Sequence, residues 1–164
     1  MYTFLNAIIF YFMTTTMAGT LEVSSTAFSQ NGSIPSVYTC EGRSIQPPLT
    51  IKNIPAGSQS LAIIMDDPDA PGTFVHWVAW NIDPSMKNIL ENSSPGTQGM
   101  NGKNAGGYTG PCPPTGIHHY HFKIYALNRM LDLPTSAGKM ALEAAMEGHV
   151  ISRGEIVGLY KKIR

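Results

Sequence analysis

The chain has 164 residues and a mass of 17.8 kDa, which is enough for one compact domain but too little for two ordinary ones. Eleven basic and eleven acidic side chains cancel, and only 13% of the residues are charged, so we expect no nucleic-acid-binding face. A hydrophobic content of 43% excludes a disordered chain. The 16 glycines and 12 prolines indicate many sharp turns and favour a β-rich fold over a helical bundle.

The first 18 residues differ from the rest of the chain. Residues 4–13 are mostly apolar but fall short of the roughly 20 that a spanning helix needs, so we expect no stable membrane span. The apolar run fits a secretory signal peptide, although the first 42 residues contain no Lys or Arg; alternatively, Met17 is the true start. We therefore expect one domain over residues 19–164, in the cytoplasm or, if the leader is a signal peptide, in the periplasm or secreted.

Short apolar runs separated by turn residues follow in chain order. A weak strand pattern covers residues 21–28. The continuous apolar runs at residues 60–65 and 76–82 are typical of buried strands. Residues 120–127 alternate apolar and polar side chains, and residues 155–161 form a last strand.

The second half of the chain adds a loop and a helix. Residues 93–116 are rich in glycine and proline and show no apolar period, which predicts a long loop of the kind that is often functional. A helix is expected to begin at Thr135 or Ser136 and to run to about Glu147, where Gly148 ends it.

Two groups of titratable residues lie at the ends of predicted strands. Asp66, Asp67 and Asp69 follow the strand at residues 60–65, and three carboxylates so close together repel one another unless cations, backbone N–H groups or a proton relieve them. A solvated acidic turn is the simpler interpretation. His76 enters a strand that should be buried, where a histidine satisfied by neighbours in the core is the common case.

A third group contains His118, His119, Tyr120 and His121. In a strand His118 and Tyr120 point to one face and the other two histidines to the opposite face, so at most two of the three imidazoles can share a site. A small anion fits this group, because imidazoles, a hydroxyl and free N–H groups of the glycine-rich loop can donate to it.

A metal site would need a ligand from elsewhere, such as His76 or Asp67, and we do not expect one. Two cysteines cannot form a disulfide scaffold, and they lack zinc-site spacing. The serines lack the G-x-S-x-G context of serine hydrolases, and no Walker or G-x-G-x-x-G motif occurs. These observations favour a binding protein over an enzyme.

Three separated motifs occur in a characteristic order: Asp67-Pro68-Asp69-Ala70-Pro71, then His76-Trp77, then Gly110-Pro111-Cys112-Pro113-Pro114 with Gly116-Ile117-His118-His119-Tyr120. From about Leu21 to the C-terminus the chain resembles the phosphatidylethanolamine-binding protein family. The resemblance is strongest to its bacterial and archaeal branch, the Raf-kinase-inhibitor-like proteins of the YbhB/YbcL type. The segment 99–108 departs from the family pattern, because it lacks an aromatic and an acidic residue, and this affects the rim of the family's pocket.

The resemblance implies a mainly β fold, a sandwich of two antiparallel sheets with a few peripheral helices. It implies a pocket for phosphate or phosphorylated lipid head groups, without metal or cofactor. The residues carried over to this pocket are Asp67, His76, Gly110, Pro111, His118 and Tyr120, supported by Asp69, Pro71 and Trp77. Family members modulate kinases and proteases, so a protein partner of this kind is open, as is homodimerisation.

Three functions remain open. The first is a non-enzymatic anion or phospho-ligand binding protein. The second is a hydrolase or lyase with His76 or His118 as general base and Asp67 as its partner. The third is an interaction protein with a vestigial pocket. The resemblance also predicts that Cys40 and Cys112 lie near each other, and leaves open whether they form a disulfide.

Overall fold

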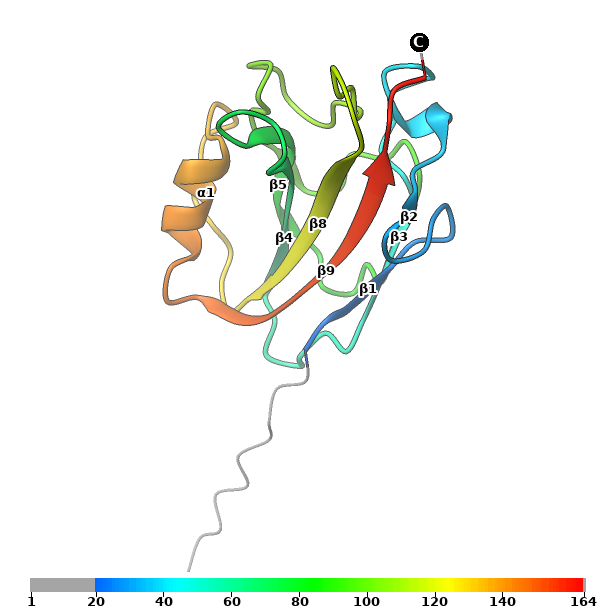
Figure 1. Cartoon of the computed structure of the whole chain (residues 1–164). Helices are drawn as coiled ribbons and strands as arrows, with labels where there is room; N and C mark the ends of the chain where they lie inside the picture. Colours follow the sequence, from blue (N-terminus) through cyan, green and yellow to red (C-terminus); the bar gives the residue numbers. More distant parts are fainter. Residues whose placement is uncertain (1–19, 164) are drawn as a thin grey trace, which may run out of the picture.

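Two β-sheets face each other in the structure, a computed structural model that describes residues 20–163 (Figure 1). The smaller sheet is antiparallel and has the order β1-β3-β6. Its strands are β1 (Glu22–Ser24), β3 (Leu49–Lys52) and β6 (Asn88–Ile89). The signal-like segment predicted at residues 1–18 lies outside the described residues.

The larger sheet has six strands in the order β2-β9-β8-β4-β5-β7. They are β2 (Gly32–Ser33), β4 (Ser60–Asp67), β5 (Phe74–Ile82), β7 (Thr97–Gln98), β8 (His118–Leu127) and β9 (Val150–Tyr160). The pairs are antiparallel except that β2 runs parallel to β9, which the sequence did not indicate. The prediction of a mainly β fold with two sheets is confirmed.

In the described part of the chain, α1 (Lys139–Met146) covers the outer side of the larger sheet, and a short 3-10 helix, η1 (Ser36–Tyr38), follows β2 (Figure 1). The helix begins later than Thr135 or Ser136. The N–H of Ala137 donates to the carbonyl of Pro134 in a turn, and the helix starts only after Gly138. Hydroxyl residues therefore do not cap it, contrary to the prediction.

The continuous apolar run in β4 is explained by cover on both faces of the strand. Leu61, Ile63 and Met65 lie in the core between the two sheets. Ala62 and Ile64 lie in a second core, which the buried side of α1 shares. A strand covered on both faces loses the alternation of apolar and polar residues, as the sequence indicated.

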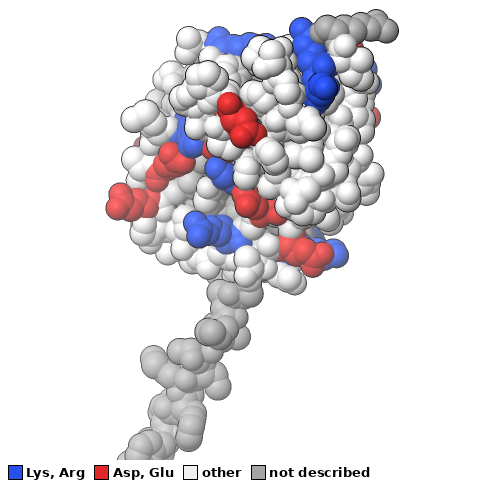
Figure 2. Space-filling model, viewed as in Figure 1, with Lys and Arg blue, Asp and Glu red and all other residues white. Residues whose placement is uncertain are grey.

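The predicted long loop at residues 93–116, all of which the structure describes, contains little regular secondary structure. Only the two-residue strand β7 and a bridge between Met100 and Gly106 interrupt it. No helix in the described part of the chain is long and apolar enough to cross a membrane. On the face shown in Figure 2, basic and acidic side chains are interspersed among a large uncharged area.

Candidate functional site

Asp67 is the last residue of β4 and is 97% buried. Its Oδ1 accepts the backbone N–H groups of Asp69 and Ala70 at 3.0 and 3.2 Å, which shapes the turn after the strand. Its Oδ2 lies 2.7 Å from Nδ1 of His118, the first residue of β8. Since this Nδ1–H donates to the carboxylate, Nε2 is the ring nitrogen of His118 that remains for a ligand.

The neighbouring carboxylates have separate partners, which removes the repulsion expected from their spacing. Asp66 points to the other face of the sheet and accepts Lys123 Nζ at 2.8 Å and Lys139 Nζ at 2.6 Å. Asp69 accepts both the backbone N–H and Nδ1–H of His119, at 2.7 and 2.8 Å. A solvated acidic turn is therefore wrong for Asp66, which is buried, and describes only the exposed Asp69.

His76 reaches the site through an irregularity in β5. Consecutive residues of β4 pair with Trp77 and Val75, so His76 is the extra residue of a β-bulge. In a regular strand His76 and Trp77 would face opposite sides. Instead, Trp77 packs in the core between the sheets, and the His76 ring lies edge-on to the ring of Tyr120 in the same core, 5.2 Å away. The bulge thus brings His76 to the side on which Tyr120 lies.

The surroundings of His76 favour the neutral form of its imidazole. Burial lowers its pKa, and a hydrogen bond from Nδ1–H to the carbonyl oxygen of Thr109, 2.7 Å away, only partly offsets this effect. The N–H of Thr109 returns a hydrogen bond to the carbonyl of His76 at 2.8 Å. This double connection fixes the tautomer of His76 and leaves its Nε2 as a hydrogen-bond acceptor.

Tyr120 completes the group. Its ring also stacks near that of His118, with the centroids 6.5 Å apart, and its hydroxyl is buried without a hydrogen-bond partner among the described residues. Burial raises the pKa of Tyr120, and the nearby charge of Asp67 raises it further, so the phenol is protonated at any physiological pH. An unpaired buried hydroxyl is costly unless it has a purpose or a missing partner.

The backbone groups of Gly110 and Pro111 are engaged by the loop at residues 38–44. The N–H of Gly110 donates to Ser44 Oγ at 2.9 Å, and the carbonyl of Pro111 accepts the N–H of Cys40 at 3.0 Å. A Cβ on Gly110 would lie only 2.7 Å from the carbonyl oxygen of Tyr38, so the close approach requires glycine. The expectation of free N–H groups for an anion at this part of the loop is therefore wrong.

The predicted proximity of the two cysteines is confirmed. Cys40 and Cys112 are joined by a disulfide, with their Cα atoms 5.4 Å apart and a sequence separation of 72.

The three residues predicted to support the site, Asp69, Pro71 and Trp77, have different surroundings. Trp77 donates its indole N–H to Gln98 at 2.8 Å and packs against Tyr108, so it stiffens the core under the site. Asp69 acts through His119, as described above, and Pro71 is exposed in the turn.

His119 and His121 lie on the opposite face from His118, as strand alternation predicts, and His121 pairs with Glu155 at 3.3 Å. Among residues 20–163 no group of three or more His, Cys, Asp or Glu side chains is arranged to hold a metal ion.

Two residues that contact His76, Thr109 and Phe74, were not predicted from the sequence. Thr109 orients His76 through its backbone carbonyl, which any residue type would supply, so no sequence signal could have shown it. The ring of Phe74 packs edge-on against His76 with the centroids 4.8 Å apart. An aromatic residue two positions before a buried histidine was a usable but weak signal.

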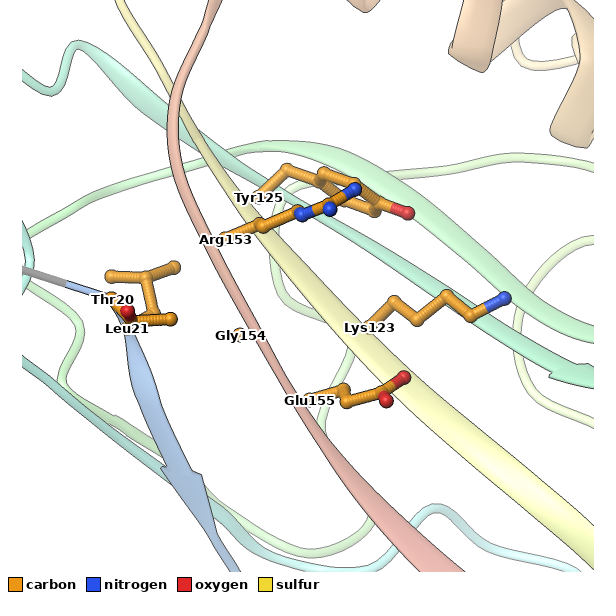
Figure 3. Close-up of a pocket in the computed structure, with 7 residues that line it drawn as sticks. All are labelled: Thr20, Leu21, Lys123, Tyr125, Arg153, Gly154 and Glu155. Atoms are coloured by element: carbon orange, nitrogen blue, oxygen red, sulfur yellow. The ribbon is translucent and has the colours of Figure 1, made fainter.

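A hollow of about 550 Å³ lies elsewhere, on the outer face of β8 and β9 beside the start of the described chain. Figure 3 shows the Arg153 side chain alongside the ring of Tyr125, with Lys123 and Glu155 next to each other. None of the predicted site residues lines this hollow. Charges of both signs line this hollow, and the side chains of Arg153 and Glu155 are exposed. The hollow therefore lacks the convergent buried groups found around Tyr120.

The comparisons with known proteins agree with the motifs. The family described as phosphatidylethanolamine-binding protein matches residues 24–161. UPF0098 protein PH1269 of Pyrococcus horikoshii is 50% identical over 153 residues, covering 87% of this chain and 77% of that protein. A UPF0098 protein of Aquifex aeolicus is 41% identical over 152 residues, covering 87% of this chain and 89% of that protein.

Two solved structures are similar in fold. The phosphatidylethanolamine-binding protein homologue CT736 of Chlamydia trachomatis has a TM-score of 0.85 and 37% identity, covering 87% of this chain and 98% of that one. Escherichia coli YbcL, described as a member of the mammalian phosphatidylethanolamine-binding protein family, has a TM-score of 0.82 and 25% identity, covering 88% and 99%. This chain therefore belongs to the phosphatidylethanolamine-binding protein family, in its bacterial and archaeal UPF0098 and YbcL-type branch.

Proposed function

We propose that the protein is a non-enzymatic binding protein for a small anion, phosphate or a phosphorylated head group. The buried, unpartnered hydroxyl of Tyr120 carries the proposal. It lies beside two imidazoles whose Nδ1 atoms are both engaged, which leaves two Nε2 atoms and one O–H group for a ligand. A phosphate group can satisfy all three at once, because its oxygens accept from the Tyr120 O–H and from each Nε2 that carries a proton, and a protonated phosphate oxygen can donate to an Nε2 that does not.

The site favours a small ligand. The side chain of His118 is only 11% exposed and those of His76 and Tyr120 are buried, so a ligand approaches along the edge of His118. Since burial favours the neutral imidazole of His76, its Nε2 either takes up a proton when the anion binds or accepts a hydrogen bond from a protonated phosphate oxygen. Both routes make the affinity rise as the pH falls from about 8 toward 6.

Titration calorimetry with phosphate and with phosphoethanolamine tests the proposal. We expect His118→Ala and His76→Ala each to weaken binding by about 1.5 to 3 kcal/mol, the range for a hydrogen bond to a charged group. The matched control is His119→Ala, which removes a neighbouring imidazole on the other face of β8 and should leave the affinity unchanged.

The calorimetry also separates the anion from a metal ligand. Wild-type affinity in His118→Ala would mean that the assigned site is wrong. Loss of binding in the presence of a chelator, or in His119→Ala, would support a metal site instead.

One observation favours an enzyme as the second candidate. The hydrogen bond from His118 to Asp67 has the geometry of a general base and the residue that orients it. A hydrolase would release phosphate from phosphoethanolamine during long incubation, which phosphorus NMR detects. An uncleaved ligand in the wild type, alongside measurable binding, supports the binding protein.

The partner and the compartment are proposed from the family and from the disulfide. Modulation of a kinase or protease and self-association follow from the family alone, and fold does not fix such roles. The disulfide between Cys40 and Cys112 favours an oxidising compartment, so it supports the periplasmic or secreted alternative over the cytoplasm. Comparing the thiol content of the protein as isolated from each compartment decides between them.

A further inference from the structure

The segment 108–112 links the cysteine pair to the candidate site. On one side it holds His76, because the Thr109 carbonyl accepts the imidazole Nδ1–H and fixes its tautomer. On the other side it rests on the loop at residues 38–44. Three hydrogen bonds connect the two segments: Tyr108 Oη to the Tyr38 carbonyl at 2.8 Å, and the Gly110 and Pro111 contacts described above.

The disulfide is the covalent part of this contact, and it is open to solvent. Both Cys40 and Cys112 are exposed, so the bond contributes little to core packing and a thiolate can reach it. Beyond it, residues 113–116 form no hydrogen bond with any other part of the described chain before β8 begins. Apart from the packing of the buried Pro113, the disulfide is therefore the last attachment of the loop before the strand that supplies His118.

We propose that the disulfide between Cys40 and Cys112 positions the segment 109–111 against His76, so that anion affinity depends on the oxidation state of this pair. The inference rests on the proposed anion-binding function. With the bond intact, Thr109 holds the imidazole in the orientation that presents Nε2 to the ligand. With the bond cleaved, hydrogen bonds and the packing of the buried residues 109–111 are left to hold the segment, and ligand binding must also order the loop.

The reaction that changes the state is thiol–disulfide exchange with a dithiol. A thiolate of the dithiol attacks one Sγ and breaks the Sγ–Sγ bond, which forms a mixed disulfide and releases the other cysteine as a thiolate that takes up a proton. The second thiol of the reductant then closes its own disulfide and frees the first cysteine. Two electrons and two protons pass from the dithiol to Cys40 and Cys112.

Phosphate calorimetry tests the inference on three samples of the full chain: oxidised wild type, wild type reduced with dithiothreitol, and the double variant Cys40→Ser/Cys112→Ser. The samples are compared at a temperature where circular dichroism shows that all are folded. We expect the reduced protein and the double variant to bind phosphate about five- to tenfold more weakly than the oxidised protein, the effect of ordering one loop on binding. The affinity of the double variant should not change with reductant.

A second variant separates positioning from lost stability. Met146→Ala weakens the core under α1, away from the site, and should leave the phosphate affinity at the oxidised wild-type value. NMR of the His76 imidazole gives an independent signal, because loss of the Thr109 hydrogen bond changes its tautomer resonances on reduction.

Equal phosphate affinity in oxidised and reduced protein overturns the inference and leaves the proposed function intact. Absence of phosphate binding in the oxidised wild type overturns the proposed function itself.

Discussion

The hydroxyl of Tyr120 is predicted to help binding and to cost stability. It is buried without a partner in the unliganded protein, so replacing Tyr120 with Phe removes an unsatisfied polar group from the core. We expect Tyr120→Phe to raise the free energy of unfolding by up to about 1 kcal/mol and to weaken phosphate binding by about 1 kcal/mol or more. Chemical denaturation and calorimetry on the same preparation measure both. A variant that is less stable and binds equally well would show that the hydroxyl has a structural partner instead.

His76 should make the protein less stable in mild acid. Burial lowers its pKa in the folded state, so below about pH 6.5 the unfolded chain binds a proton that the folded protein does not. The contribution of His76 is thus fully present above pH 6.5 and falls as the pH drops toward the lowered pKa, by about 1.4 kcal/mol for each pKa unit. Urea denaturation of wild type and His76→Gln at pH 7.5 and 5.5 measures it, and the loss should be smaller in the variant. An imidazole NMR titration that places His76 above pH 6.5 would contradict the prediction.

At the residue scale the sequence was informative where a simple period applied. Alternation along a strand placed His118 and Tyr120 together and His119 apart, and the structure agrees. The bulge at His76 could not be predicted, because it arises from the pairing of β5 with β4 rather than from any local pattern. The backbone donors expected from Gly110 failed for a similar reason, since Ser44 is 66 positions away in sequence.

At the scale of elements, Asp66 connects α1 to the larger sheet. Burial tends to raise its pKa, but the hydrogen bonds and charges of Lys123 and Lys139 outweigh burial, and the pKa is lowered. Lys139 is the first residue of the helix, so the ion pairs hold the helix start against β4. We infer that this contact compensates for the missing side-chain cap.

Asp66→Asn should lower the free energy of unfolding by about 3 kcal/mol near neutral pH, because two partly buried ammonium groups lose their counter-charge. A carboxylate with a lowered pKa stabilises the fold above about pH 4, and the contribution is lost as the pH falls through the lowered value, so the difference between variant and wild type should shrink there. The control is Asp69→Asn, whose exposed pair with His119 should contribute less than about 1 kcal/mol. Guanidinium titrations at pH 7 and pH 3 provide the comparison, and an equal loss from both variants would contradict the assignment.

The length of an element decided whether the sequence revealed it. The runs at residues 60–65 and 76–82 carried enough apolar residues to be recognised, and each strand proved two residues longer than predicted, β4 at its end and β5 at its start. Strands of two residues, such as β2, have no period to detect and exist only through their neighbours. The helix start was misplaced because a turn at Pro134 and Ala137 uses the residues that looked like a cap.

At the scale of the whole molecule, we expect the disulfide to contribute a large part of the free energy of unfolding. It links positions 72 residues apart, and restricting the unfolded chain by a loop of that length is worth roughly 4 kcal/mol in the chain-entropy model. We expect reduction with dithiothreitol to lower the urea midpoint accordingly, with the Cys40→Ser/Cys112→Ser variant matching the reduced protein. Identical midpoints with and without reductant would show that the pair is not oxidised in the preparation.

The bulge in β5 also affects how ligand-binding homologues can be recognised from their sequences. A homologue that lost a single residue between Phe74 and Trp77 would still carry the histidine and tryptophan letters, yet its imidazole would turn to the helix side of the sheet, away from Tyr120. Searches for ligand-competent relatives should therefore count the spacing from Asp67 to His76 as part of the signature. A shortened spacing would mark a chain that has kept the fold and lost the pocket.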